Sequence, residues 1–211
     1  MKIIATSNGI SGGKIKKELQ NLIVPGQGAE STIAICCNAL RYQPVRWVFG
    51  IARAMSFRAM GYSTVHVDLA RISSEKLVEL CGSFQNLYLG PGDTRRLLMR
   101  WQAEGLGSLL LEHIKQHNGT MIGESAGSIL FGASIKTADY LGDSQSVQLD
   151  SLQGLGLFSD LISLFVHGNS DKEDRLRRAI WEMKSYSQVV NLPYGEAYVK
   201  YADGSERRVI G

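Results

Sequence analysis

The sequence predicts an α/β protein in which helices cover both faces of a mostly parallel sheet. Short apolar runs typical of strands alternate along the chain with segments whose apolar residues recur at helical spacing. Such alternation forms βαβ units, which place parallel strands in one sheet. The chain has 211 residues, only four prolines and no evident internal repeat. We therefore expect residues 1–211 to form a single domain.

The first half of the chain predicts four strands and three helices. Pro44 and Gly61 bound one of these helices, and its Trp47 and Phe57 are expected in the core. A Gly-rich loop at 8–13 lacks the Gly-Lys-Ser/Thr ending of a P-loop and does not predict a phosphate site. The elements, in order, are strand 2–7, helix 14–22, strand 31–39, helix 45–60, strand 63–69, helix 73–80 and strand 86–89.

The second half continues the alternation and ends in a hairpin around residues 202–204. The polar segment 135–143 is expected to be a loop. The remaining elements are helices at 95–102 and 106–117, a strand and a helix on either side of Ser125, strands at 155–158 and 161–166, helix 173–184, strand 188–192, and hairpin strands at 195–201 and 207–210.

Composition limits the kinds of partner that the protein can have. The chain is 44% hydrophobic and 20% charged, as in ordinary soluble proteins, and its net charge of +3 is too small to imply a nucleic-acid partner. No apolar stretch is long enough to span a membrane, and the apolar run at residues 3–6 is too short for a signal peptide. We expect a protein without a membrane or nucleic-acid partner.

The cysteines and histidines do not predict a metal site or a cofactor. Cys36, Cys37 and Cys81 are an odd number without metal-site spacing, so we expect buried, reduced thiols in a cytoplasmic protein. His113 and His117 lie one helical turn apart, but no third ligand accompanies them.

Residues 120–130 carry the strongest functional signal. A short apolar run leads into Gly-x-Ser-x-Gly and then into small and apolar residues at helical spacing, which is the pattern of a strand, a tight turn and a helix. Gly123 and Gly127 allow the chain to reverse and the helix to pack closely. Ser125 is thereby held out of the backbone at a helix N-terminus, the position of a nucleophile.

A serine nucleophile needs a base, two oxyanion donors and an acid that orients the base. Among the four histidines, His167 alone follows a predicted strand after the serine. The backbone N–H groups of Ala126 and Gly92 are candidate oxyanion donors, because each follows a strand at the same edge of the sheet. Several downstream acids remain open as the third member: Asp139, Asp143, Asp171 and Glu196.

Four motifs, in order, resemble those of the S51 serine peptidases, which include dipeptidase E and cyanophycinase. Residues 87–94 resemble the family's strand ending in Gly-Gly-Gly-Asn-Thr, and residues 122–127 resemble its nucleophile motif. Residues 165–167 with 172–177 resemble its histidine segment and helix, and residues 191–196 resemble its late Leu-Pro-Glu-Gly turn. The resemblance implies a fold similar to class I glutamine amidotransferases, with Ser125 as nucleophile, His167 as base, and Gly92 and Ala126 as oxyanion donors.

The sequence departs from the family pattern at two positions. Pro91 replaces a middle glycine of the oxyanion loop, and Tyr194 stands where the family's triad glutamate is expected. Glu196 lies two residues further on and would face the same side if the strand continued, so it is the candidate replacement. By position, Arg175 is the candidate to meet an acidic substrate group.

The sequence thus predicts a serine hydrolase that cleaves small peptides or related amides through an acyl-enzyme, as a monomer or homodimer. The main alternative is a catalytically impaired relative that keeps the pocket for binding, which Pro91 and Tyr194 favour. An α/β-hydrolase esterase is a third reading, and that fold would place the acid at Asp139 or Asp143, between nucleophile and histidine.

Overall fold

The central sheet has seven strands in the order β3-β2-β4-β5-β1-β8-β9. The computed structural model describes residues 1–10, 13–143, 147–159 and 161–211, so Ser11 and Gly12 of the Gly-rich loop lie outside it. Five strands pair in parallel, and the antiparallel hairpin of β8 and β9 extends the sheet beside β1. The strands are β1 (Lys2–Thr6), β2 (Thr32–Cys36), β3 (Ser63–His66), β4 (Asn86–Leu89), β5 (Thr120–Glu124), β8 (Glu196–Lys200) and β9 (Glu206–Ile210).

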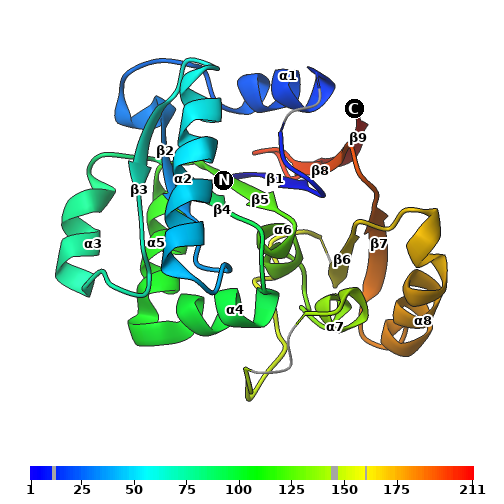
Figure 1. Ribbon diagram of the computed structural model, residues 1–211. Coiled ribbons are helices and arrows are strands. Elements are labelled where there is room, and N and C mark those ends of the chain that lie inside the picture. Colours follow the sequence, from blue (N-terminus) through cyan, green and yellow to red (C-terminus); the bar gives the residue numbers. More distant parts are fainter. Residues whose placement is uncertain (11–12, 144–146, 160) are drawn as a thin grey trace.

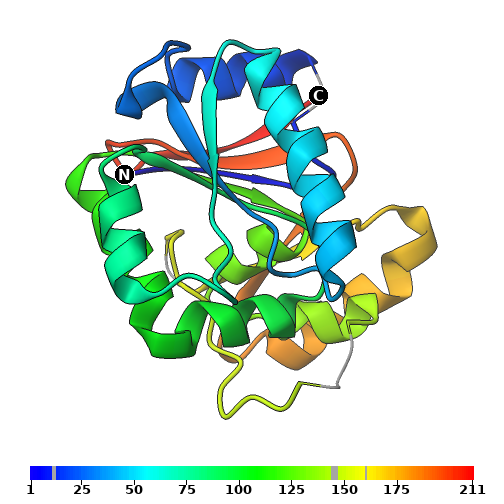
Figure 2. The same cartoon turned by 60° about the vertical axis from the view of Figure 1, so that its left-hand side comes forward.

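Helices cover both faces of this sheet, as predicted (Figure 1, Figure 2). One face carries α1 (Gly13–Leu22) and α2 (Gln43–Arg58). The other carries α3 (Ser74–Cys81), α4 (Thr94–Gln102), α5 (Leu106–Gln116) and the short α6 (Ala126–Phe131). None of the described helices combines the length and apolar character needed to cross a membrane.

Each face of the sheet has its own hydrophobic core. Side chains of α1 and α2 pack with Ile4, Ile35 and Tyr88 on one face, while α3 to α6 pack with Ile3 and Leu87 on the other. Alternate side chains of a strand point to opposite faces, so a core on each face buries the central strands β2, β4 and β5 along their whole length.

The adjacent cysteines follow the same alternation. Cys36 belongs to the core beneath α3 to α6, and Cys37 belongs to the core beneath α1 and α2. Both thiols are free and buried, as expected, and burial raises the pKa of each to about 12. They therefore remain protonated at neutral pH.

A second, two-stranded sheet stands beside α6, the helix that follows Ser125. Its parallel strands β6 (Ile162–Val166) and β7 (Gln188–Leu192) are connected by α8 (Glu173–Met183) at the right-hand side of Figure 1. The N–H of Ala133, just after α6, donates to the carbonyl of Ile162 at 2.7 Å. This contact joins the first residue of β6 to the chain just after the helix that follows Ser125, and His167 follows the other end of the same strand.

Three expectations about local structure were wrong. Segment 135–143 contains helix α7 (Thr137–Leu141), whose Thr137 hydroxyl donates to the Leu164 carbonyl at 2.7 Å. Segment 155–158 is not a strand, because the N–H groups of Leu155 and Leu157 donate to carbonyls at the end of α6. Tertiary hydrogen bonds outweighed local preference in both cases.

Trp47 is the third. Its side chain is 70% exposed, although it shares a helical face with the buried Gly50, Ala54 and Phe57. At this end, α2 borders a cavity beyond the strand ends instead of the sheet, and Trp47 lines that cavity.

We expect Gly127→Ala to destabilise the protein by about 1–3 kcal/mol, because overpacking of this order follows when a buried methyl group meets fixed backbone. A Cβ at Gly127 would lie 2.1 Å from the Leu89 carbonyl oxygen. Urea denaturation followed by circular dichroism measures the change. Gly13→Ala is the control, since its Cβ would meet nothing within 4 Å and should cost no stability. Equal stability of the two variants would contradict the close approach.

Candidate active site

Ser125 occupies a sharp turn between β5 and α6. Its backbone has φ +52° and ψ −106°, a conformation that non-glycine residues rarely adopt and that marks strained turns at functional sites. A Cβ at Gly123 would lie 2.7 Å from the backbone N of Ser128, and one at Gly127 would meet the Leu89 carbonyl. Both glycines are therefore needed for the turn, as the sequence predicted.

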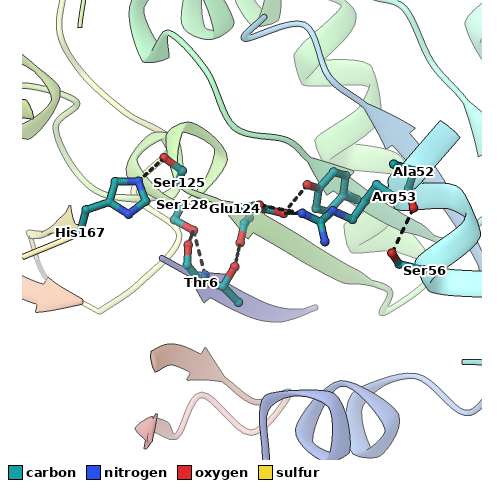
Figure 3. A network of polar contacts seen from close by, with 10 residues as sticks. Thr6, Ala52, Arg53, Ser56, Glu124, Ser125, Ser128 and His167 are labelled. Atoms are coloured by element: carbon teal, nitrogen blue, oxygen red, sulfur yellow. Dashed lines mark hydrogen bonds and ion pairs between the residues drawn. The ribbon is translucent and has the colours of Figure 1, made fainter. Parts of the chain in front are cut away.

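The turn leaves Ser125 partly exposed, whereas the residues on either side of it are buried. Within residues 119–132, all of which the structure describes, Ser125 is the one residue that is not buried. Its N–H donates to the Thr6 carbonyl at 3.0 Å. Ser128 exchanges two hydrogen bonds with the Thr6 backbone, at 2.7 and 2.9 Å (Figure 3). These bonds tie the first turn of α6 to the end of β1.

His167 meets Ser125 from the other sheet. It directly follows β6, and its Nε2 lies 2.8 Å from Ser125 Oγ (Figure 3). An imidazole nitrogen at this distance can accept the proton of the hydroxyl. The two residues that the sequence singled out as nucleophile and base are brought together.

The other imidazole nitrogen of His167 faces a serine. Ser7, the buried residue after β1, places its Oγ 3.0 Å from His167 Nδ1, and the same oxygen accepts the backbone N–H of His167 at 2.9 Å. The ring of Tyr194 packs against the imidazole with centroids 4.9 Å apart. Ser7 was not predicted as a site residue, because a serine at the end of a predicted strand carries no motif.

The acid expected at Glu196 lies elsewhere. Its carboxylate pairs with Arg208 across the β8–β9 hairpin. The expectation assumed that a strand runs from Tyr194 to Glu196, but β8 begins only at Glu196. Tyr194 and Gly195 form a turn, in which Gly195 has φ +79°. The alternation of a strand therefore does not carry Glu196 to the histidine.

The other candidate acids either bond other groups or are exposed to solvent. Asp139 pairs with Arg95 at 2.8 Å, and Asp143 accepts the backbone N–H of Thr94 at 2.7 Å. Asp171 is exposed. In the described part of the chain, no carboxylate contacts His167.

The loop after β4 lies beside the turn at Ser125. Its ends are fixed by hydrogen bonds from Gly90 N to the Cys36 carbonyl at 2.9 Å and from Asp93 N to the Ala39 carbonyl at 3.0 Å. Gly92 has φ +136°, and a Cβ there would lie 2.6 Å from the Ala39 carbonyl carbon. Among the described residues, neither Gly92 N–H nor Ala126 N–H has an acceptor. Two donors thus remain free next to Ser125.

The profile of peptidase family S51 matches residues 3–207. The chain belongs to peptidase family S51. The resemblance seen in the four motifs is therefore confirmed, and the protein is a member of a family of peptidases.

Solved structures share the fold of this S51 member. A candidate peptidase E protein from Listeria monocytogenes EGD-e has 18% identity and a TM-score of 0.79, with 100% of this chain and 98% of that chain covered. A peptidase from an acI-B1 Actinobacterium has 15% identity and a TM-score of 0.78, with 100% and 87% covered. Among curated proteins, none matches the sequence.

Arg175 of the S51 member lies exposed in the first half of α8. Its guanidinium is 3.4 Å from the Tyr140 carbonyl oxygen, a contact between α8 and α7. A role in meeting an acidic substrate group stays a prediction.

A buried ionic network behind Ser125 was missed by the sequence analysis. Glu124, inside the nucleophile motif, accepts hydrogen bonds from Arg53 of α2 at 2.8 Å and from the Tyr88 hydroxyl at 2.5 Å (Figure 3). A buried carboxylate requires such partners. The network fastens α2 to the residue before Ser125. In the sequence, its signal is a glutamate at the end of a strand that is otherwise expected to be buried.

His167 is held in its neutral form. Burial, with a smaller effect of the nearby Lys172 charge, lowers the pKa of His167 to about 4. Across the neutral range the imidazole therefore has a nitrogen free to accept a proton. Because the unfolded chain would bind a proton at the ordinary pKa of 6.5, stability from the neutral ring is complete above pH 6.5 and is lost as pH falls toward 4.

We expect the Cε1 proton shift of His167 to stay constant across neutral pH and to titrate with a midpoint at about pH 4, because burial disfavours the charged ring. Proton NMR with assignment by His167→Gln measures this. A midpoint at the ordinary value of 6.5 would contradict the desolvated environment.

Proposed function

We propose that this S51 member is a serine peptidase that hydrolyses small peptides or related amides through an acyl-enzyme at Ser125. The single observation that carries the proposal is the 2.8 Å contact between Ser125 Oγ and His167 Nε2, on a strained turn that exposes the serine. Turns of this kind present nucleophilic serines in hydrolases.

In this mechanism Ser125 Oγ attacks the scissile carbonyl while His167 Nε2 takes its proton. His167 then gives that proton to the leaving amine, and an acyl-enzyme remains on Ser125. Water attacks the acyl carbon with His167 again as base, which releases the acid product and restores the serine. The neutral state of His167 near pH 7 supports its role as base.

The N–H groups of Gly92 and Ala126 are the proposed oxyanion donors. Both belong to positions where the backbone is rigidly held, and both lack a competing acceptor in the described residues. Preorganised donors of this kind stabilise the negative charge of a tetrahedral intermediate. Pro91 has no N–H, so this loop offers one donor fewer than a glycine there would supply.

Ser7 takes the place of the orienting acid in this proposal. For Nε2 to act as base, Nδ1 must carry the proton, and Ser7 Oγ is 3.0 Å away to accept it. A hydroxyl can accept the Nδ1 proton as a carboxylate does, but it can also donate to an unprotonated Nδ1, and it stabilises the imidazolium less because it carries no charge.

The proposal extends to the cellular location and the oligomeric state of the protein. Three free cysteines, two of them buried, suit a reducing compartment, which supports the cytoplasm. The proposed partner is a small peptide substrate, and the protein acts as a monomer or homodimer.

A second candidate function is binding without catalysis. The observation that favours it is the missing carboxylate at His167, since an acid normally stabilises the imidazolium formed during attack. Labelling of Ser125 by a fluorophosphonate would count against this alternative, whereas a folded protein that is never labelled would favour it.

We expect wild type to cleave members of a dipeptide library that includes Asp-X and β-aspartyl peptides, and Ser125→Ala to lose at least about 10³-fold of that rate. Release of amino acids, measured by mass spectrometry at equal folded concentration, provides the rate. Ser108→Ala is the control, because Ser108 lies on the exposed side of α5. Equal cleavage by wild type and Ser125→Ala would exclude Ser125 as nucleophile.

We expect Ser7→Ala to lower kcat/KM by about tenfold or more, because Nδ1 loses the group that accepts its hydrogen bond. Ser7→Thr should retain most activity, since it keeps the hydroxyl. Glu196→Gln should stay within about twofold of wild type, because its carboxylate pairs with Arg208. Kinetics on the best library substrate measure all three. Loss in Glu196→Gln without loss in Ser7→Ala would return the third role to Glu196.

A further inference from the structure

A cavity of about 240 Å³ lies at the carboxyl ends of β2 and β3, beneath the first turns of α2. It opens at the same edge of the sheet as Ser125, but its lining includes none of Ser125, His167 or Gly92. One strand, β4, separates β2 from β5, the strand that leads to Ser125, in the sheet order. Crevices beyond the carboxyl ends of parallel strands are the usual ligand sites of α/β sheets.

Fixed packing keeps the cavity open. Gly50 of α2 faces His66 at the end of β3, and a Cβ at this position would lie 3.2 Å from His66 Cε1. Any larger side chain would take the space between helix and strand. Ile35, Val67 and Trp47 give the cavity an apolar part.

The polar part of the lining contains one anion and two cations. Arg46 Nη1 lies 3.7 Å from Asp68 Oδ1, which is longer than a hydrogen bond. Arg71 also lines the cavity, where its guanidinium donates to Gln43 Oε1 at 2.8 Å. Opposite charges are thus close together but are not neutralised by direct hydrogen bonding.

Both charged groups at the centre of this arrangement keep free hydrogen-bonding capacity. Arg46 Nε is buried and has no acceptor among the described residues. Asp68 Oδ1 accepts from Asn38 at 2.6 Å and from Ala70 N at 3.0 Å, which fixes the carboxylate, whereas Oδ2 accepts from no described residue. A buried donor without an acceptor is costly, so a ligand that supplies one gains affinity.

The charges select the ligand class. A simple anion would be repelled by Asp68, and a simple cation would be repelled by Arg46 and Arg71. A molecule that carries both charges satisfies both, and the 3.7 Å between the protein's charged groups is close to the separation between the two charged groups of an α-amino acid. The volume lies below the roughly 300–1,000 Å³ of pockets for drug-sized ligands, which limits the occupant to amino-acid size.

We propose that this cavity binds a free α-amino acid, with its carboxylate at Arg46 and Arg71, its ammonium group at Asp68, and an apolar side chain against Ile35, Val67 and Trp47. Binding there requires no chemistry at Ser125, so it holds whether or not the protein is a peptidase. A product of peptide hydrolysis and an amino acid from solution present the same groups to the cavity.

Isothermal titration calorimetry with leucine, methionine, glutamate and lysine, each at about 10 mM, tests the proposal on the full chain. Saturable binding of leucine or methionine is expected. Leucine amide lacks the carboxylate and N-acetyl-leucine lacks the ammonium group, so each should bind at least tenfold more weakly. Equal binding of either analogue, or no binding of any of the four amino acids, would overturn the proposal.

Variants locate the site. Arg46→Gln and Asp68→Asn should each weaken leucine binding at least tenfold, and Arg71→Gln is the milder second test of the carboxylate end. Arg58→Gln is the matched control, since Arg58 bonds Thr64 outside the cavity and its loss should not change binding. Thermal unfolding of each variant checks that it is folded.

Two further samples, Ser125→Ala and fluorophosphonate-treated wild type, test whether leucine binds in the cavity or at the active site. Leucine should bind both with the affinity of untreated wild type. Loss of binding in either would assign the amino acid to the Ser125 site and overturn the cavity as its location. A failure of peptide cleavage together with intact leucine binding would instead reject only the proposed hydrolase function.

Discussion

The close approach of α6 to the sheet is the constraint on which the rest of the site depends. Gly127 lies against the Leu89 carbonyl, and Gly123 lies against the backbone of the new helix, so the chain turns within one residue. Ser125 is that residue, and it carries the strained backbone that joins β5 to α6. The helix N-terminus and the loop at Gly92 are brought beside the serine by the same contact.

The contacts of the His167 imidazole could not be derived from the alternation of side chains along the strands. His167 comes from a sheet separate from that of Ser125, and its Nδ1 partner comes from the end of β1. A hydroxyl there holds the ring without adding negative charge, and burial then keeps the pKa of His167 low. The site therefore holds a neutral imidazole, in contrast to one in which a carboxylate raises the basicity of its histidine.

One helix connects two parts of the sheet edge that differ in chemistry. Arg53 in the middle of α2 reaches Glu124 next to Ser125, while Arg46 in the first turn of the same helix lines the amino-acid-sized cavity. Glu124 is enclosed and paired, so it anchors the helix. Asp68 is 38% exposed and incompletely paired, so it is available to a ligand. The Arg53–Glu124 pair thus stabilises packing, whereas the Arg46–Asp68 pair keeps hydrogen-bonding groups that a ligand can use.

The sequence by itself determined the α/β alternation, the turn at Ser125 and the choice of His167, because periodicity, glycines and motif spacing are local properties of the chain. Tertiary structure decided that β6 and β7 leave the main sheet, that residues 155–158 bond the end of α6, and that Trp47 is exposed. It also placed Ser7 at His167 and turned Glu196 toward Arg208. These features depend on which distant backbone groups and side chains meet, and a turn at Tyr194 and Gly195 was enough to separate an acid from the histidine that its spacing had suggested.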